Sequence, residues 1–388
     1  MKKFVRTLLA ASVAALVMPA ASTVFAAARP VSAAVPAEAA SAGGSDPGRI
    51  APYRARFGRL RPVIAIIGEN SGTELTDFVV PYGVLSRAGV ADTIAVATQP
   101  GAITMRPALR IQPQATIAEF DVRYPQGADY VIVPAVVKRE DPVLLAWIAA
   151  QGSKGGTVVS ICDGALVVAA SGLMKGHRAT AHWATEGLRA KVYPDTHWVK
   201  NVRYVADGRI VSSAGISASI PVSIALVEAI AGRARAQGVA DELGVPDWST
   251  VHNSDAFLPR FGVNLMAYIR TAYTNARLHR RQDIGVPVAP GVDEIGLALT
   301  ADAYTRTGRS HAYALAASDA PLPTRYGLAV IPDRVVGGTD PVDQVLPGFD
   351  ATPSAQLLDV ALAGIARRFG RSTAYGVALD LEYPGFRK

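Results

Sequence analysis

A series of short Val- and Ile-rich runs alternates with helical patterns between residues 62 and 240, and it is the feature that most constrains the fold. Continuous apolar strands separated by helices are typical of a mostly parallel sheet covered by helices on both faces. In such sheets, ligands bind at the carboxyl ends of the strands. The predicted strands are 63–67, 93–97, 130–134, 157–161, 178–180, 202–206 and 210–213, and the predicted helices are 74–88, 142–151, 164–171 and 220–233.

Cys162 is the only cysteine of the chain, and it lies at one of these carboxyl ends. The strand 157–161 leads into it, and a small-residue helix pattern starts at Gly164. Backbone N–H groups and the helix dipole at such a junction favour a thiolate. The N–H of Asp163 is placed to stabilise an oxyanion. The sequence therefore predicts a nucleophile at Cys162, with a buried thiol that packs as a small apolar side chain as the alternative.

The first 26 residues have the pattern of a signal peptide. Three cations precede an apolar stretch over residues 8–18, and residues 24–26 offer a cleavage site. We expect export to the periplasm or the medium with cleavage. The alternative is an N-terminal membrane anchor, although the apolar stretch is short for a bilayer span of about 20 residues. Residues 27–60 are rich in Ala, Pro, Ser and Gly and are predicted to be a flexible linker.

Charge and residue spacing exclude several kinds of partner. The formal net charge of +7 becomes +4 without the three leader cations, and the densest basic cluster, 277–281, is short. A nucleic-acid binder carries a concentrated basic face, so no nucleic-acid partner is expected. The six histidines lack metal-ligand spacing and the cysteine has no second one to pair with, so we expect no metal, no cofactor and no internal disulfide. The expected partner is a small molecule, with no stable membrane span after cleavage.

The chain is long enough for two folded units, since typical domains have about 100–200 residues. We expect one unit at 62–240 and a second α/β unit at 241–388. Within the second, residues 294–333 loosely echo residues 74–113, so this unit is either a degenerate internal repeat or an unrelated domain. It holds no cysteine. Its expected role is packing, partner contact or covering the first site.

Three segments resemble one protein family. Residues 160–183 resemble the nucleophile-elbow segment of the ThiJ/PfpI proteins, within the class I glutamine amidotransferase-like superfamily. Residues 72–85 and 212–218 resemble, in order, two segments of the branch that includes isonitrile hydratases and the sensor domains of amidase-like AraC-type regulators. The resemblance covers about residues 62–240. It implies a flavodoxin-like three-layer sandwich with a mostly parallel sheet and a strand-to-helix nucleophile elbow.

The resemblance also implies roles for individual residues. Cys162 matches the nucleophile, and Asp77 matches a carboxylate that hydratase members place near it. Glu69 lies where many superfamily members keep a glutamate that hydrogen-bonds the thiol. His182 matches a histidine that serves as general base or charge partner. The candidate catalytic residues are therefore Cys162, Asp77, Glu69 and His182, with the backbone of Asp163 and Gly164 at the oxyanion position.

The implied function is an exported cysteine-dependent amidase or hydratase that acts on a small carbon–nitrogen substrate, and relatives suggest a homo-oligomer. Two departures from the family pattern favour a non-catalytic alternative. Asp163 stands where relatives often carry His, Thr or Ala, and a carboxylate facing the sulfur raises the pKa of a thiol. Residues 133–136 lack the Gly-Gly that commonly supplies an oxyanion N–H. The alternative is a non-catalytic periplasmic ligand-binding or redox- and stress-sensing module of the same fold.

Overall fold

The computed structural model describes residues 48–349 and 352–387. The predicted signal peptide and most of the predicted linker lie outside the described residues. Residues 48–60 form no helix or strand, but they are held against the fold: the N–H of Tyr53 donates to the carbonyl of Ala229 at 2.8 Å, and Arg59 pairs with Asp129 at 2.9 Å. Within the described ranges, no helix is both long and apolar enough to cross a membrane.

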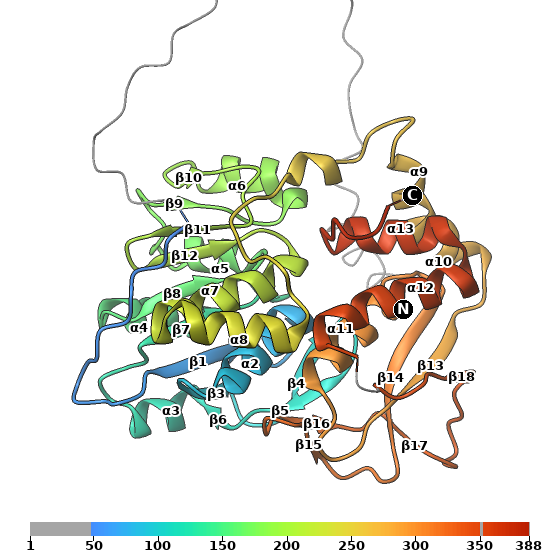
Figure 1. Cartoon of the computed structure of the whole chain (residues 1–388), viewed down its shortest axis with the longest axis horizontal. Coiled ribbons are helices and arrows are strands. Elements are labelled where there is room, and N and C mark those ends of the chain that lie inside the picture. The colour runs from blue at the N-terminus through green and yellow to red at the C-terminus, as the bar shows by residue number, and fades with distance from the viewer. Residues whose placement is uncertain (1–47, 350–351, 388) are drawn as a thin grey trace, which may run out of the picture. The chain divides into compact units, whose positions relative to one another are not determined.

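A seven-stranded sheet lies at the centre of the N-terminal region (Figure 1). Its order is β11-β12-β8-β7-β1-β3-β6, and every neighbouring pair is parallel except β11 with β12. The mostly parallel sheet predicted from the sequence is therefore confirmed. The strands are β1 (Val63–Gly68), β3 (Asp92–Ala97), β6 (Ala115–Thr116), β7 (Tyr130–Val133), β8 (Thr157–Ser160), β11 (Tyr204–Asp207) and β12 (Ile210–Ser213).

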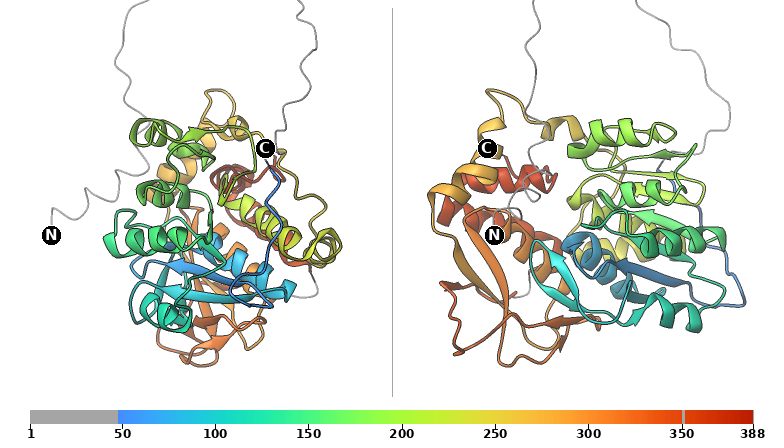
Figure 2. Two further views of the ribbon diagram at one scale, coloured as in Figure 1. Left: turned by 90° about the vertical axis from the view of Figure 1, so that its left-hand side faces the viewer. Right: turned by 180° about the vertical axis from the view of Figure 1, so that it is seen from behind.

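Helices cover both faces of this sheet and complete a three-layer sandwich (Figure 2). Successive residues of a strand point to opposite faces, so Ile64 and Ile66 enter one apolar core while Val63, Ala65 and Ile67 enter the other. This is why the strands read as continuous apolar runs. The first core includes α2 (Leu75–Ala88), α7 (Ser219–Ala231) and α8 (Arg233–Leu243), and the second includes α3 (Ile117–Arg123), α4 (Pro142–Ser153) and α5 (Gly164–Ala170).

The C-terminal region contains a second, smaller parallel sheet, with the order β17-β14-β13-β18. Leu75 and Leu85 of the N-terminal region share one apolar core with Ile295 and Leu362 of the C-terminal region. The second α/β unit is thus observed, whereas its boundary as a separate domain stays a prediction. Its elements are α9 (Leu265–Ile269), α10 (Asn275–Leu278), β13 (Gln282–Pro287), α11 (Glu294–Thr305), β14 (Ser310–Ala316), β17 (Arg334–Val335), β18 (Gln344–Val345), α12 (Leu357–Phe369) and α13 (Arg371–Asp380).

A third sheet joins the two regions, with the order β15-β16-β5-β4-β2. The contact is the antiparallel pairing of β16 with β5. Its strands are β2 (Thr73–Glu74), β4 (Ile103–Arg106), β5 (Arg110–Gln112), β15 (Leu322–Pro323) and β16 (Ala329–Ile331). Near the elbow, the chain adds a short pair of strands and one helix: β9 (Arg178–Ala179), α6 (Glu186–Val192) and β10 (His197–Trp198).

Candidate active site

Cys162 occupies a sharp turn between β8 and α5. Its φ angle is 55°, in the left-handed region that side-chain-bearing residues seldom adopt. A Cβ atom on Gly164 would lie 2.0 Å from the carbonyl oxygen of Val133, so only glycine fits two residues after the cysteine. The N–H of Cys162 points to the hydroxyl of Ser213 at 3.4 Å. The predicted strand-to-helix elbow is therefore present, with the backbone strain that often marks functional sites.

The surroundings of the thiol oppose its ionisation. Burial raises the pKa of Cys162 well above its ordinary value, and the charges of Asp77, Asp163 and Glu74 act in the same direction. A hydrogen bond from the N–H of Asp163 acts against them, and the pKa remains raised. Only 5% of the residue is exposed. The thiol is therefore neutral in this conformation, although its place before a helix had suggested a thiolate.

Asp77 is a carboxylate whose charge acts on the thiol, and it lies in the first turn of α2. It is fully buried, and its Oδ2 accepts the N–H of Ala135 at 3.1 Å. Its Oδ1 is buried with no hydrogen-bond partner in the described part of the chain. Burial raises the pKa of Asp77 well above its ordinary value. A buried carboxyl group whose charge acts on the thiol thus has one oxygen without a hydrogen-bond partner in the described part of the chain.

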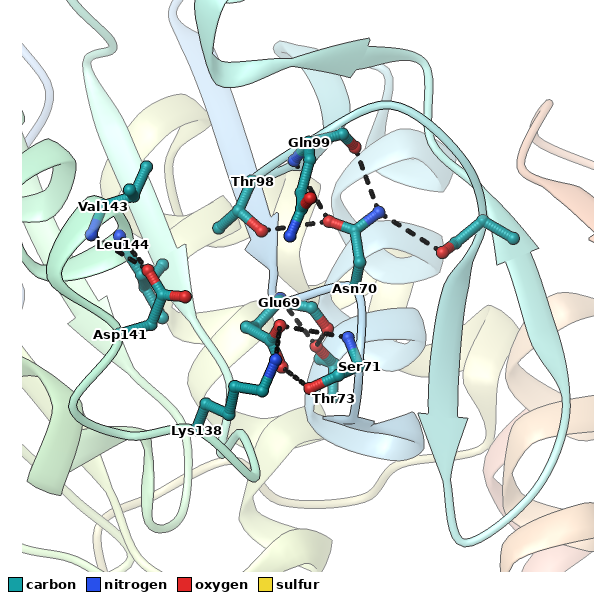
Figure 3. Close-up of polar contacts among 11 residues, drawn as sticks. Glu69, Asn70, Ser71, Thr73, Thr98, Gln99, Lys138, Asp141, Val143 and Leu144 are labelled. Atoms are coloured by element: carbon teal, nitrogen blue, oxygen red, sulfur yellow. Dashed lines mark hydrogen bonds and ion pairs between the residues drawn. The ribbon is translucent and has the colours of Figure 1, made fainter.

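Glu69 is buried as well, but its own loop uses its oxygens (Figure 3). Oε1 accepts the N–H of Ser71 at 3.1 Å, Oε2 accepts the Ser71 hydroxyl at 2.5 Å, and the Lys138 ammonium lies 3.7 Å from Oε1. The hydrogen bonds of this carboxylate therefore go to Ser71 rather than to Cys162. Of the two acidic candidates, the structure places Asp77 in the thiol environment and gives Glu69 a local role in the loop after β1.

His182 is buried and held through both ring nitrogens. Its Nδ1 accepts the N–H of Ala184 at 3.2 Å, so the ring proton lies on Nε2, which donates to the carbonyl of Asp380 at 3.1 Å. A neutral imidazole bound in this way has no nitrogen left for a substrate. His182 thus orients the backbone around the site, and a role as general base would require it to break one of these bonds.

The Asp163 carboxylate is tied to the segment after β9. The Thr185 hydroxyl donates to it at 2.6 Å, and Arg189 from α6 donates to the carbonyl of His182 at 2.5 Å. Burial raises the pKa of Asp163, while the Thr185 hydrogen bond and the charge of Arg189 act against this. The side chain is thereby anchored while the N–H of Asp163 faces the sulfur.

The C-terminal region adds charged residues that the sequence did not predict. Arg306, after α11, reaches Glu74, Asp302 and Asp380, each at 2.5 Å. Glu74 immediately precedes α2, the helix that carries Asp77, and its side chain makes no capping hydrogen bond. Burial raises the pKa of Glu74 well above its ordinary value, and the charge of Arg306 acts against this. Arg306 is therefore the cation that compensates the acidic groups behind the thiol.

Glu382, just after α13, is the second such residue. It is fully buried, has a φ angle of 54°, and accepts the N–H of Gly215 at 2.6 Å. Its Oε1 lies 2.9 Å from Nε2 of His252. Burial would raise the pKa of Glu382, but the hydrogen bond with His252 outweighs it and the pKa is lowered. An ionised carboxylate thus holds the turn that follows Ser213.

A three-layer α/β sandwich with a cysteine in a left-handed elbow defines the class of this protein, and comparison with known proteins names the family. The DJ-1/PfpI family matches residues 63–229. Isonitrile hydratase of Pseudomonas putida is 30% identical over 171 residues, which cover 43% of this chain and 72% of that protein. The chain belongs to the DJ-1/PfpI family, as the resemblance of its motifs implied.

More distant similarities cover the same part of the chain. Protein dj-1beta of Drosophila melanogaster is 24% identical over 177 residues, 44% of this chain and 91% of that protein. The crystal structure of Drosophila DJ-1beta has a TM-score of 0.44 at 22% identity and covers 48% of this chain and all of that chain. In the described ranges, no group of three or more His, Cys, Asp or Glu side chains is arranged to hold a metal ion.

Proposed function

We propose that the protein is a cysteine-dependent enzyme that hydrates or hydrolyses a small carbon–nitrogen substrate, with Cys162 as nucleophile. The observation that carries the proposal is a thiol in a strained elbow that feels the charge of Asp77, a buried carboxylate whose Oδ1 has no hydrogen-bond partner in the described residues. The family relation to an isonitrile hydratase supports this class of substrate. The low exposure of the sulfur, 5% for the residue, favours a small substrate.

In this scheme, Asp77 first takes a proton from the Cys162 thiol and then gives it to the substrate. Asp77 accepts the thiol proton as the sulfur forms a bond to the electrophilic carbon, and the protonated carboxyl group then gives that proton to the substrate. In hydration, water then adds to the same carbon, one of its protons goes to the substrate nitrogen, and the other returns to the sulfur as the carbon–sulfur bond breaks and leaves an amide. In hydrolysis of an amide, the protonated amine leaves as the carbon–nitrogen bond breaks, and water then attacks the resulting thioester and returns one proton to the sulfur. Because the charge of Asp77 raises the pKa of the thiol, loss of a proton from one group affects the ionisation of the other. The raised pKa of Asp77 suits a group that both takes and returns a proton near neutral pH.

The N–H of Asp163 supports the developing charge in this proposal. It already faces the sulfur, so charge that develops on the attacked group would lie close to it. The side chain of Asp163 is held away by Thr185 at 2.6 Å. His182 orients the neighbouring backbone rather than moving a proton, since both of its nitrogens are engaged.

Turnover of a panel of isonitriles, nitriles and primary amides tests this function. The expected result is hydration or hydrolysis of at least one class by the wild type and loss of at least a thousandfold in kcat for Cys162→Ala and Asp77→Asn, with Glu69→Gln nearly unaffected. Trapping of a covalent adduct on Cys162, seen by intact mass, would support the nucleophile. Equal turnover by Cys162→Ala would refute it.

A second candidate is a non-catalytic ligand-binding module, and the buried, neutral thiol favours it. In that case Cys162→Ser leaves ligand affinity unchanged and no adduct forms. A redox-sensing role of the same sulfur requires thiolate character, which the raised pKa of Cys162 opposes. Intact mass after mild peroxide separates these two alternatives, since only the sensor gains oxygen atoms.

We also propose export, which the cations and apolar stretch of the first 26 residues support. Expression of the full chain in a bacterium with cell fractionation is the test. A periplasmic product whose mass lacks about the first 26 residues is expected. A full-length product retained with the membrane would favour the N-terminal anchor instead.

A further inference from the structure

The C-terminal region repeats the order of elements of the N-terminal region at a constant spacing. Gln282 begins β13 219 residues after Val63 begins β1, and the same spacing relates the starts of four further pairs. These pairs are α11 with α2, β15 with β4, β16 with β5, and β17 with β6. The start of β14 follows that of β3 by 218 residues, one fewer. The structure therefore supports the internal repeat that the echo of residues 74–113 in residues 294–333 indicated.

The last two helices repeat as well, at a shorter spacing. Leu357 begins α12 138 residues after Ser219 begins α7, and α13 follows α8 at the same spacing. Both helix pairs are joined by a glycine of positive φ, 84° at Gly232 and 90° at Gly370. The spacing falls from 219 to 138, a difference of 81 residues, between β17 and α12. The first copy has α4, β8 and α5 in that interval, so the second copy lacks the elbow.

The two copies are related by an internal two-fold axis. In the β5–β16 pairing, Ile111 opposes Val330, its own equivalent at a spacing of 219. Self-complementary contacts of this kind are the mark of a two-fold interface. The ion pairs obey the same rule: Arg306 with Glu74 corresponds to Arg87 with Asp293. Arg306 with Asp380 likewise corresponds to Arg87 with Glu242, at the shorter spacing for the second partner.

The symmetry breaks at the thiol site. Glu382 corresponds to Gly244, and Gly215 corresponds to Pro353, both at a spacing of 138. Gly244 has a φ angle of 75° and Glu382 one of 54°, so the second copy holds a glutamate in a conformation that suits glycine. On the thiol side the glutamate binds the N–H of Gly215. On the opposite side, the glycine packs against Pro353 and makes no such bond.

We propose that Glu382, supplied by a shortened second copy of the 63–244 fold, is a positioning residue of the Cys162 site. It fixes the N–H of Gly215 at 2.6 Å, two residues after Ser213, whose hydroxyl faces the N–H of Cys162 at 3.4 Å. Close by, the carbonyl of Asp380 holds His182. The residues after α13 therefore hold the turns around the elbow from the second copy of the fold, as residues of a second subunit could in a two-fold dimer, but within one chain.

The consequence is that loss of the Glu382 carboxylate loosens the elbow while the fold remains. Glu382→Gly removes both hydrogen bonds but suits the positive φ, so the backbone is not strained by the change. Glu382→Gln keeps an oxygen for the N–H of Gly215. Gly244→Ala disturbs the equivalent junction on the side that has no thiol, because its Cβ would lie 2.7 Å from Gln356 and 2.8 Å from Pro353.

The test is the rate of iodoacetamide labelling of Cys162 in the folded full chain, followed by intact mass, with the free energy of unfolding measured for each variant. We expect Glu382→Gly to label at least tenfold faster than wild type, Glu382→Gln to restore the rate to within threefold, and Gly244→Ala to label no faster than its loss of stability accounts for. Equal rates for Glu382→Gly and wild type, or equal acceleration in Gly244→Ala at matched stability, would overturn the proposal. The inference rests on the proposed thiol site but not on its chemistry: absence of turnover would remove the enzyme function and leave this comparison intact.

Discussion

The guanidinium of Arg306 lies 2.5 Å from the carboxylate of Glu74, although 232 residues separate them in the chain. Glu74 stands at the start of the helix that carries Asp77, and the same guanidinium binds Asp302 and Asp380. The acidic groups behind the thiol therefore depend on a cation from the other end of the sequence.

Arg306→Gln should destabilise the protein more than the matched variant Arg87→Gln. Removing one partner of a buried ion pair costs about 3 kcal/mol, and Asp302 is fully buried while the Glu74 side chain is only 15% exposed. The ion pairs of Arg87 are longer, 3.9 Å, and one of its acidic partners is half exposed, so its loss should cost about 1 kcal/mol. Denaturant unfolding at pH 8 measures both. Equal losses in the two variants would show that Arg306 has no special share in the charge balance.

The loss in free energy of unfolding caused by Arg306→Gln should become smaller as the pH falls from 8 to 5. Burial already raises the pKa of Glu74 and of Asp302, and loss of the compensating cation raises them further. Protonation then removes the uncompensated charge from the folded state. Unfolding curves at several pH values test this. A deficit that stays constant over the range would mean that the carboxylates are not the source of the loss.

Asp77→Asn should raise the free energy of unfolding at pH 7 by about 1 kcal/mol while it abolishes turnover. The pKa of Asp77 is raised in the folded state, so its stabilising contribution is present at low pH and is lost as the pH rises toward that folded pKa. Asparagine keeps an acceptor for the N–H of Ala135 without ionising. The gain should therefore vanish near pH 4. Destabilisation at pH 7 would contradict the assignment of a raised pKa.

Labelling of Cys162 should be slow at pH 7 and should rise about tenfold per pH unit through pH 9, because its raised pKa keeps the thiol neutral. The charge of Asp77 contributes to the raised pKa of Cys162, so Asp77→Asn should label faster than wild type at pH 8. Chain unfolded in urea is the control, with the profile of an ordinary thiol. A folded-state rate that does not change with pH would show a thiolate already formed at neutral pH.

Gly164→Ala should cost about 3 kcal/mol and displace the elbow, since the new methyl group would meet the Val133 carbonyl at 2.0 Å. Gly187→Ala is the matched control, because α6 leaves open space at that position and alanine is the better helix former. The control should keep or raise stability by up to about 1 kcal/mol. Thermal unfolding with Cys162 labelling compares the two. A Gly164→Ala protein with wild-type labelling would argue against a tightly packed elbow.

The parallel sheet could be predicted because strands buried on both faces leave an uninterrupted apolar pattern, as in 63–67 and 157–161. Helix α8 was not predicted. Its residues, 233–243, are polar at only five of eleven positions, and the predicted helix 220–233 ran past Gly232, where the structure separates α7 from α8. In the sequence, the repeat was only weakly visible. Equivalent residues such as Arg87 and Arg306 keep similar ion pairs, but most other equivalent residues of the two copies differ.

The parts of the site that one continuous segment forms could be predicted from the sequence, whereas contacts between distant segments could not. Cys162, Asp163 and Gly164 form the elbow by themselves, and Asp77 follows from the first turn of α2. Glu69 has the expected position in sequence, but the Ser71 hydroxyl and backbone satisfy it locally. One sequence feature pointed to Glu382. The segment 370–382 resembles the segment 232–244, and Glu382 stands where the first segment ends in Gly244.

The pairing of β5 with β16 joins two segments of one polypeptide. Two separate chains held by the same strands would come apart on dilution, with a dissociation constant that sets the concentration at which the complex is lost. Covalent continuity makes the association a first-order process, so the fraction assembled does not depend on protein concentration. On dilution into a large volume, the lifetime of the thiol site is then governed by unfolding alone.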